Sequence, residues 1–267
     1  MAGNPGGVDP LNPLAPAGSP YLAAPRGPTS QSELEIRWDY PVYAPKVETP
    51  TGRTVATFEK RVLPLLEAMA ILAGADRRPV LVLRECQTCT GTDDALLTRR
   101  ADNEKTMLMS RWFHCVKLPA DVLDVDHPFH ALFEGDSPSH LFIADWDGSG
   151  RTNLNGQQSR TELWSIMGEK LSARYASTHE TALAELFSIL GELDALDDKV
   201  GSLRQQLDAE IEKDGPKSAQ AAKIQKEITR LANERSELRE RAVRVSALKL
   251  KERHRPASAG APSSEKA

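Results

Sequence analysis

The feature that most constrains the fold is a short apolar run, Val80–Leu83, which is followed closely by a Cys86-Gln-Thr-Cys89 pair. A continuous run of Val and Leu bounded by proline is typical of a strand that is buried on both faces. Two thiols at positions i and i+3 can approach each other within one helical turn or a tight loop. The sequence therefore predicts a central buried strand that ends in a Cys-x-x-Cys pair.

Further helical and extended patterns surround this strand. Alternating apolar residues predict a first strand within 33–43, and apolar residues three and four positions apart predict a helix over 54–73. Pro64 marks either the first turn of that helix or a kink in it. After the cysteines we expect, in order, a helix over 95–100, a strand over 105–118, a strand over 140–146, a hairpin turn at 147–150, a partner strand over 152–154 and a helix over 157–175.

This order of elements resembles the thioredoxin-like fold over residues 34–175. The resemblance implies that Cys86 and Cys89 are a redox pair, in which Cys86 attacks a substrate disulfide and Cys89 resolves the mixed disulfide. It also implies that Pro138 is the family's substrate-binding cis-proline beside the pair. The local motif departs from the family's pattern, because Arg84-Glu85 replaces an aromatic-rich segment and Gln87-Thr88 replaces Gly-Pro.

The reactivity of the pair depends on where the next helix begins. A helix that starts at Gln87 would place Cys86 at its N-terminus, where partial positive charge favours the thiolate. A helix that starts after Thr92 would leave both cysteines in the preceding loop. The sequence is therefore consistent with an active dithiol and with a vestigial or structural pair.

Metal and cofactor sites are not expected. Zinc would need ligands from Cys115 and from His114, His127 or His130, and their spacing fits no regular motif. Cys115 is expected to be a core residue instead. A calcium loop beginning at Asp145 would need Glu at its twelfth position, where this chain has Gly156. We expect a hairpin turn there, and no cofactor.

Residues 176–248 have the pattern of an antiparallel coiled-coil hairpin around an Asp214-Gly215-Pro216 turn. Such a hairpin has a thin core of its own, so we expect it to pair with a second copy, giving a homodimer, or with a partner protein. The alternative is that it folds back onto the α/β domain. The heptad positions are Leu186, Ile189, Leu193, Leu196, Val200, Leu203 and Leu207 on the first arm, and Ile224, Ile228, Leu231, Arg235, Leu238, Ala242 and Val245 on the second.

The ends of the chain are predicted to be disordered. Residues 1–33 hold seven prolines and few bulky apolar residues, and the tail 249–267 turns from basic residues to Pro, Ala and Ser. There is no apolar run long enough for a membrane span and no secretory signal pattern. Three cysteines do not make a disulfide framework, which favours a cytoplasmic location. A net charge of −4 gives no support to nucleic acid as a partner.

These patterns support two hypotheses about function. The first is a thioredoxin-like thiol–disulfide oxidoreductase that acts on protein disulfides through Cys86 and Cys89. The second is a non-catalytic thioredoxin-like adaptor or assembly module that binds partners through its coiled coil. The degenerate motif and the length of the coiled coil favour the second, so enzyme activity is left open at this point.

Overall fold

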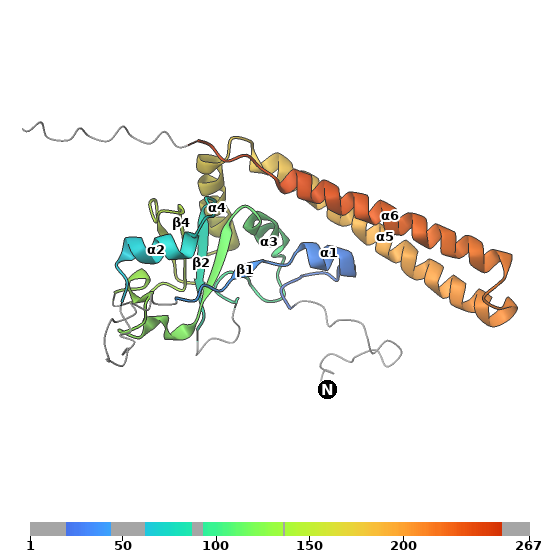
Figure 1. Cartoon of the computed structure of the whole chain (residues 1–267), viewed down its shortest axis with the longest axis horizontal. Coiled ribbons are helices and arrows are strands. Elements are labelled where there is room, and N and C mark those ends of the chain that lie inside the picture. The colour runs from blue at the N-terminus through green and yellow to red at the C-terminus, as the bar shows by residue number, and fades with distance from the viewer. Residues whose placement is uncertain (1–19, 44–61, 87–92, 136, 253–267) are drawn as a thin grey trace, which may run out of the picture.

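The computed structural model describes residues 20–43, 62–86, 93–135 and 137–252. A five-stranded sheet with helices around it forms one end of the molecule, and two long helices project from it (Figure 1). Within the described ranges, no helix combines the length and the apolar character that crossing a membrane requires.

The sheet is mixed, with the strand order β1-β3-β2-β4-β5. β1, β3 and β2 are parallel to one another, whereas β4 is antiparallel to β2 and β5 is antiparallel to β4. The strands are β1 Trp38–Asp39, β2 Val80–Arg84, β3 His114–Leu118, β4 Leu141–Ala144 and β5 Thr152–Leu154. The prediction of an α/β chain is confirmed, and the partner strand over 152–154 has its predicted bounds.

β2 is the central strand, and all five of its residues are buried. Its side chains alternate between the two faces of the sheet, as the two-residue period of a strand requires. Val80 and Val82 pack on one face, whereas Leu81 and Leu83 pack on the other. The prediction of a central strand buried on both faces is therefore confirmed.

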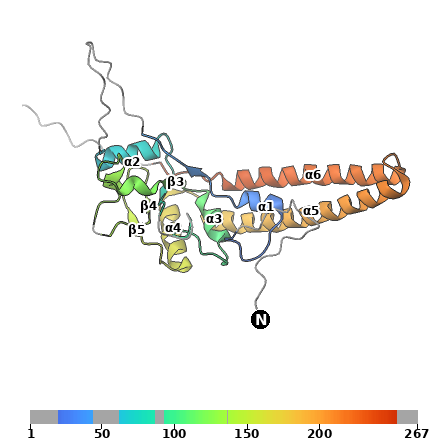
Figure 2. The same ribbon diagram turned by 90° about the horizontal axis from the view of Figure 1, so that it is seen from below.

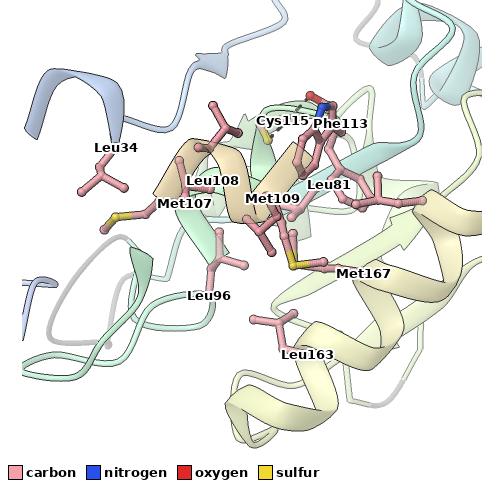
Figure 3. Close-up of a cluster of buried hydrophobic side chains, with 14 of the residues drawn as sticks. Leu34, Leu81, Leu96, Met107, Leu108, Met109, Phe113, Cys115, Leu163 and Met167 are labelled. Carbon is pink, nitrogen blue, oxygen red and sulfur yellow. Dashed lines mark hydrogen bonds between the residues drawn. The ribbon is translucent and has the colours of Figure 1, made fainter. Parts of the chain in front are cut away.

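Helices cover both faces of the sheet. α2, Leu65–Ala73, packs Met69 and Leu72 onto the face that carries Val80. α3, Glu104–Ser110, and α4, Arg160–Arg174, pack onto the opposite face, where Figure 3 shows Leu108 and Met167 beside Leu81. Pro64 is the N-cap of α2, so it begins the helix and does not kink it. Residues 54–61 lie outside the described ranges.

The predictions between the cysteines and β3 are partly wrong. Residues 104–110 form α3 and not the start of a strand over 105–118, because Glu-Lys-Thr-Met-Leu-Met is rich in strong helix formers. Residues 95–100 form turns and not a helix. Leu96 and Leu97 both bond through their N–H groups to the Asp93 carbonyl, but the next N–H, that of Thr98, bonds to Asn103 Oδ1 and so does not continue a helix. The Asn103 side chain then closes this loop by bonding to both the N–H and the carbonyl of Thr98.

The two long helices are α5, His179–Asp214, and α6, Ala219–Ser246. They run in opposite directions side by side, and Gly215, with a φ of 84°, follows the end of α5 (Figures 1 and 2). Their ion pairs follow this antiparallel arrangement, with Arg241 on Glu185 near the sheet and Lys199 on Glu227 further out. The predicted seam is apolar and largely buried, with Leu186, Ile189, Leu193, Leu196, Val200, Ile224, Leu231 and Ala242 all buried.

The base of α5 belongs to the core of the sheet domain. One continuous apolar cluster joins Leu186, Ile189 and Leu193 of α5 to Leu108 and Trp112. The division predicted between residues 34–175 and 176–248 is therefore not a boundary between two cores. α5 completes the first core before it extends beyond the sheet.

Residues 20–33, predicted as part of a disordered segment, pack against α5. They include the short helix α1, Pro28–Glu33, which lies along α5 in both ribbon views. Arg26 Nη1 bonds to Asp194 at 2.6 Å, and the N–H and hydroxyl of Thr29 both donate to Asp197 at 2.9 Å. The acceptors that order this segment lie on a distant helix, so its own composition does not reveal them. Residues 1–19 lie outside the described ranges.

Residues 249–252, predicted as the start of a disordered tail, also have a partner. The chain returns from α6 to the end of α4, where Tyr175 and Leu250 form a β-bridge. The N–H of Ala176 bonds to the Lys249 carbonyl at 2.9 Å, and the N–H of Lys251 bonds to the Arg174 carbonyl at 2.8 Å. The tail from 253 onward lies outside the described ranges.

The shared core predicts unequal effects of matched Leu→Ala substitutions along α5. Leu193 is fully buried in the common cluster, so Leu193→Ala should lower the free energy of unfolding by about 2–5 kcal/mol. Leu203 is only partly buried further out, so Leu203→Ala should cost less. Urea denaturation followed by circular dichroism measures both. Equal losses, or separate transitions for the sheet and the helices, would contradict a shared core.

Candidate functional site

The segment that leads to Cys86 is fixed by both neighbouring strands. The N–H of Arg84 bonds to the His140 carbonyl at 2.8 Å, and the N–H of Glu85 bonds to the Leu118 carbonyl at 2.8 Å. Cys86 follows directly, is half-buried and is disulfide-bonded in this structure. A rigid central strand therefore positions the first thiol of the predicted redox pair.

The predicted partner of Cys86 lies outside the described residues, because the structure describes nothing between 87 and 92. Cys89 and the helix proposed to start at Gln87 both fall in this range. The other alternative, a helix that starts after Thr92, is not found, since residues 93–100 form turns and bends.

Pro138 lies close to the Cys86 segment, as the resemblance implies. Arg84 Nε bonds to the carbonyl of Ser139 at 3.3 Å, directly after Pro138. The expected cis conformation is wrong, because no peptide bond of the described residues is cis. Trans is the intrinsically favoured isomer of an X-Pro bond. Pro138 thus lies near the C-terminal end of β2, with a trans peptide bond.

Two buried cations flank the end of β2. Lys117 is paired, with its Nζ 2.7 Å from Asp93 Oδ1 and 4.7 Å from the centre of the Trp38 ring. Arg84 is also buried, and among the described residues its guanidinium bonds to two backbone carbonyls, those of Ser139 and Glu85. Among the described residues, no carboxylate lies within ion-pair distance of Arg84. Sequence inspection missed both cations, although each is a charged residue inside or directly after an apolar run.

The buried charge of Arg84 affects its surroundings. Burial lowers the pKa of Arg84 itself. Burial and then the nearby Arg84 charge lower the pKa of His140, so the imidazole is neutral at pH 7. A positive charge beside a thiol favours the thiolate, which is the nucleophilic form of cysteine. The end of β2 therefore carries a buried positive charge two residues before Cys86 and one residue before Glu85.

Cys115 is confirmed as a core residue. Its side chain is buried in the cluster of Figure 3, and its Sγ lies 3.4 Å from the Ser110 carbonyl. Burial raises the pKa of the Cys115 thiol to about 12. His114, one of the zinc ligands considered, instead contacts Asp39 at 3.1 Å. No group of potential metal-binding side chains is found within the described part of the chain.

The 147–150 hairpin turn is confirmed, and two cationic side chains lie near the Asp145 carboxylate. The N–H of Gly148 bonds to the Asp145 carbonyl at 2.8 Å, and the N–H of Ser149 bonds to Asp147 at 3.1 Å. Lys170 and Arg174 lie 3.7 Å and 3.4 Å from Asp145 Oδ1. These side chains already neutralise the carboxylate that a calcium loop would begin with.

The fold and the site define an α/β protein with a five-stranded mixed sheet, a long helical pair and a cysteine at the end of the central strand. Comparisons of the chain with protein-family models, with curated proteins and with solved structures found no match.

The different settings of Cys86 and Cys115 predict selective alkylation. A thiol whose pKa is raised to about 12 stays protonated at pH 8, so Cys115 should not react with iodoacetamide in the reduced native protein. Cys86 is half-buried and should react under the same conditions. Mass spectrometry of peptides from native and urea-unfolded samples measures both. Equal labelling of the two residues in the native protein would contradict this assignment.

Proposed function

We propose that this chain is a thiol–disulfide oxidoreductase with a thioredoxin-like fold, in which Cys86 attacks protein disulfides and Cys89 resolves the intermediate. The observation that carries the proposal is the position of Cys86, directly after a buried central strand and beside the Pro138 segment. The disulfide at Cys86 supports it, because a redox cysteine must be able to adopt the oxidised state.

The arrangement of elements supports the fold assignment. Helix α2 and strand β2 precede the cysteines, and helix α3 and strand β3 follow them. Pro138 comes directly before the β4–β5 hairpin, and α4 closes the unit. This is the order expected from the sequence for a thioredoxin-like domain, apart from the trans bond at Pro138.

The proposed reaction transfers two electrons to the substrate. The Cys86 thiolate attacks one sulfur of the substrate disulfide, forming a mixed disulfide and releasing the other sulfur as a thiolate that takes up a proton. Cys89, after losing its proton, then attacks Cys86 Sγ and releases the second substrate thiol. The enzyme ends as a disulfide and the substrate as a dithiol. An external thiol reductant must then restore the two enzyme thiols.

The charges at the end of β2 support thiolate formation at Cys86. Lys117 is neutralised by Asp93, so Arg84 supplies the positive charge that has no carboxylate partner among the described residues. Glu85 lies between Arg84 and Cys86 in sequence and acts in the opposite direction. A thiol near a buried cation is a better nucleophile at neutral pH because more of it is ionised.

An insulin reduction assay with dithiothreitol as the reductant tests this proposal. Wild type should accelerate insulin precipitation, and Cys86→Ser should reduce the rate to that of dithiothreitol alone because the attacking thiol is lost. Cys115→Ser is the matched control and should keep the activity, since Cys115 is buried in the core. A wild-type rate equal to that of Cys86→Ser would contradict the proposal.

The helical pair favours a second function, that of an adaptor or assembly module that uses a coiled-coil hairpin to bind a second copy or a partner protein. Beyond Val200, none of the described residues of α5 is buried, and Leu203 and Leu207 are only partly buried. Two helices alone give this outer part a thin core. A second hairpin packed along it would cover these side chains.

Light scattering on the full chain tests self-association. Wild type should be a dimer at tens of micromolar, and Leu207→Glu should be monomeric because it places a charge in the outer seam. Gln205→Glu adds the same charge at an exposed position and should remain dimeric. A monomeric wild type would show that self-association is wrong. Shortening the chain to about Ser177 is a poor test, because it would remove α5 from the shared core.

A further inference from the structure

A cavity of about 680 Å³ lies between the sheet and the base of the helical pair. Its walls come from α1, from the segment before β1, from the residues that precede β2 and β3, and from the last turns of α6. This volume is within the range of small-molecule sites, which is about 300–1,000 Å³. Neither the proposed reaction at Cys86 nor pairing through the outer helices uses this cavity.

Positive charge predominates in the lining of the cavity. Five arginines from four parts of the chain lie in the lining, two of them on α6, against three glutamates in the same lining. Asp76, outside the lining, neutralises one of the arginines through a contact of 2.6 Å with Arg78. With Asp76 included, the region therefore holds four carboxylates and five guanidinium groups. The lining arginines are Arg37, Arg78, Arg111, Arg239 and Arg244.

Two of these arginines form a fixed wall. Arg78 Nη1 bonds to the Arg111 carbonyl at 3.0 Å, while its other donors hold Asp76. Arg111 Nη2 bonds to Glu33 at 2.7 Å, and Arg111 Nη1 bonds to Ser246 Oγ at 3.2 Å. These contacts join the start of the sheet, α1 and the end of α6. The shape of the wall is therefore set before any ligand arrives.

The other three arginines have donors to spare. Among the described residues, Arg239 bonds through its Nε alone, to Glu33 at 3.0 Å. Arg244 lies 3.7 Å from Glu240, which is too far for a hydrogen bond. Arg37 is exposed and has no hydrogen bond or ion pair with a described residue. Guanidinium groups with open donors recognise carboxylate and phosphate oxygens well, because their forked geometry matches two oxygens at once.

An apolar surface lies beside these charges. Val243 is 64% exposed although it is a large apolar side chain, and it lines the cavity with Phe113 and Ala247. A free inorganic ion would leave this surface in water. A ligand that joins an anionic group to an apolar group would cover it and gain the free energy of apolar burial.

We propose that this cavity binds a small organic anion, with its carboxylate or phosphate on Arg37, Arg239 and Arg244 and its apolar part against Val243. The Arg78–Arg111 wall presents a rigid surface to this ligand. Because the lining spans α1, the sheet and α6, the bound anion bridges the sheet and the helical pair and stabilises their junction.

Isothermal titration calorimetry on the full chain tests the site with phenyl phosphate and benzoate as probes. At least one of them should bind saturably, and which one does so distinguishes a phosphate site from a carboxylate site. The double variant Arg37→Gln/Arg244→Gln should weaken binding at least tenfold, because it removes open donors without touching the Arg78–Arg111 wall. Arg204→Gln, at an exposed position on the outer part of α5, is the matched control and should bind as wild type does.

The tryptophan side-chain resonances report where the probe binds. Trp112 Nε1 donates to the carbonyl of Ser246, a lining residue, at 3.0 Å. Its indole N–H signal should shift on titration, whereas those of Trp146 and Trp164 should not. No saturable binding of either probe would overturn the proposal, as would equal binding by the double variant. Phenol or inorganic phosphate binding as tightly as phenyl phosphate would also overturn it.

Discussion

The contact between the base of α5 and the sheet domain determines how this molecule is built. Leu186, Ile189 and Leu193 lie in the same apolar cluster as Leu108 on α3, so the helix completes the core below it. The same stretch of α5 carries Asp194 and Asp197, which hold the segment around Arg26 and Thr29. Without α5, one face of the sheet domain and the N-terminal segment would both lose their partners. The base of the helical pair is thus part of the core of the sheet domain. Only its outer part extends beyond that domain.

The same contact explains which features could be predicted from the sequence. Val80–Leu83 and the heptad residues carry their signal locally, in a continuous apolar run and in a repeat, and both were predicted correctly. The segments that were predicted wrongly depend on distant partners. Residues 20–33 look disordered by composition, but acceptors on a helix more than 160 positions away fix them.

The candidate site was predictable only in part, for a related reason. The Cys-x-x-Cys pair, Pro138 and the burial of Cys115 can be read from spacing and from neighbouring residues. The setting of Arg84 cannot, because the absence of a carboxylate partner among the described residues depends on which side chains the fold brings near. Helix α3 was missed for a different reason. Met107, Leu108 and Met109 supply apolar bulk that suits a strand or a helix, and the side-chain bonds of Asn103 close the loop from which the helix starts.

The central strand also determines how the two proposed sites relate to each other. Arg78 lies before β2 and lines the arginine cavity, whereas Cys86 lies after β2. The whole strand, five residues and about 17 Å long at the usual rise per residue, lies between them. Coupling between two sites needs an element with two alternative arrangements. β2 is buried on both faces and paired with β3 and β4, so a second arrangement would have to break these pairings. We therefore expect an anion in the cavity to stabilise the junction with the helical pair and to leave the reactivity of Cys86 unchanged.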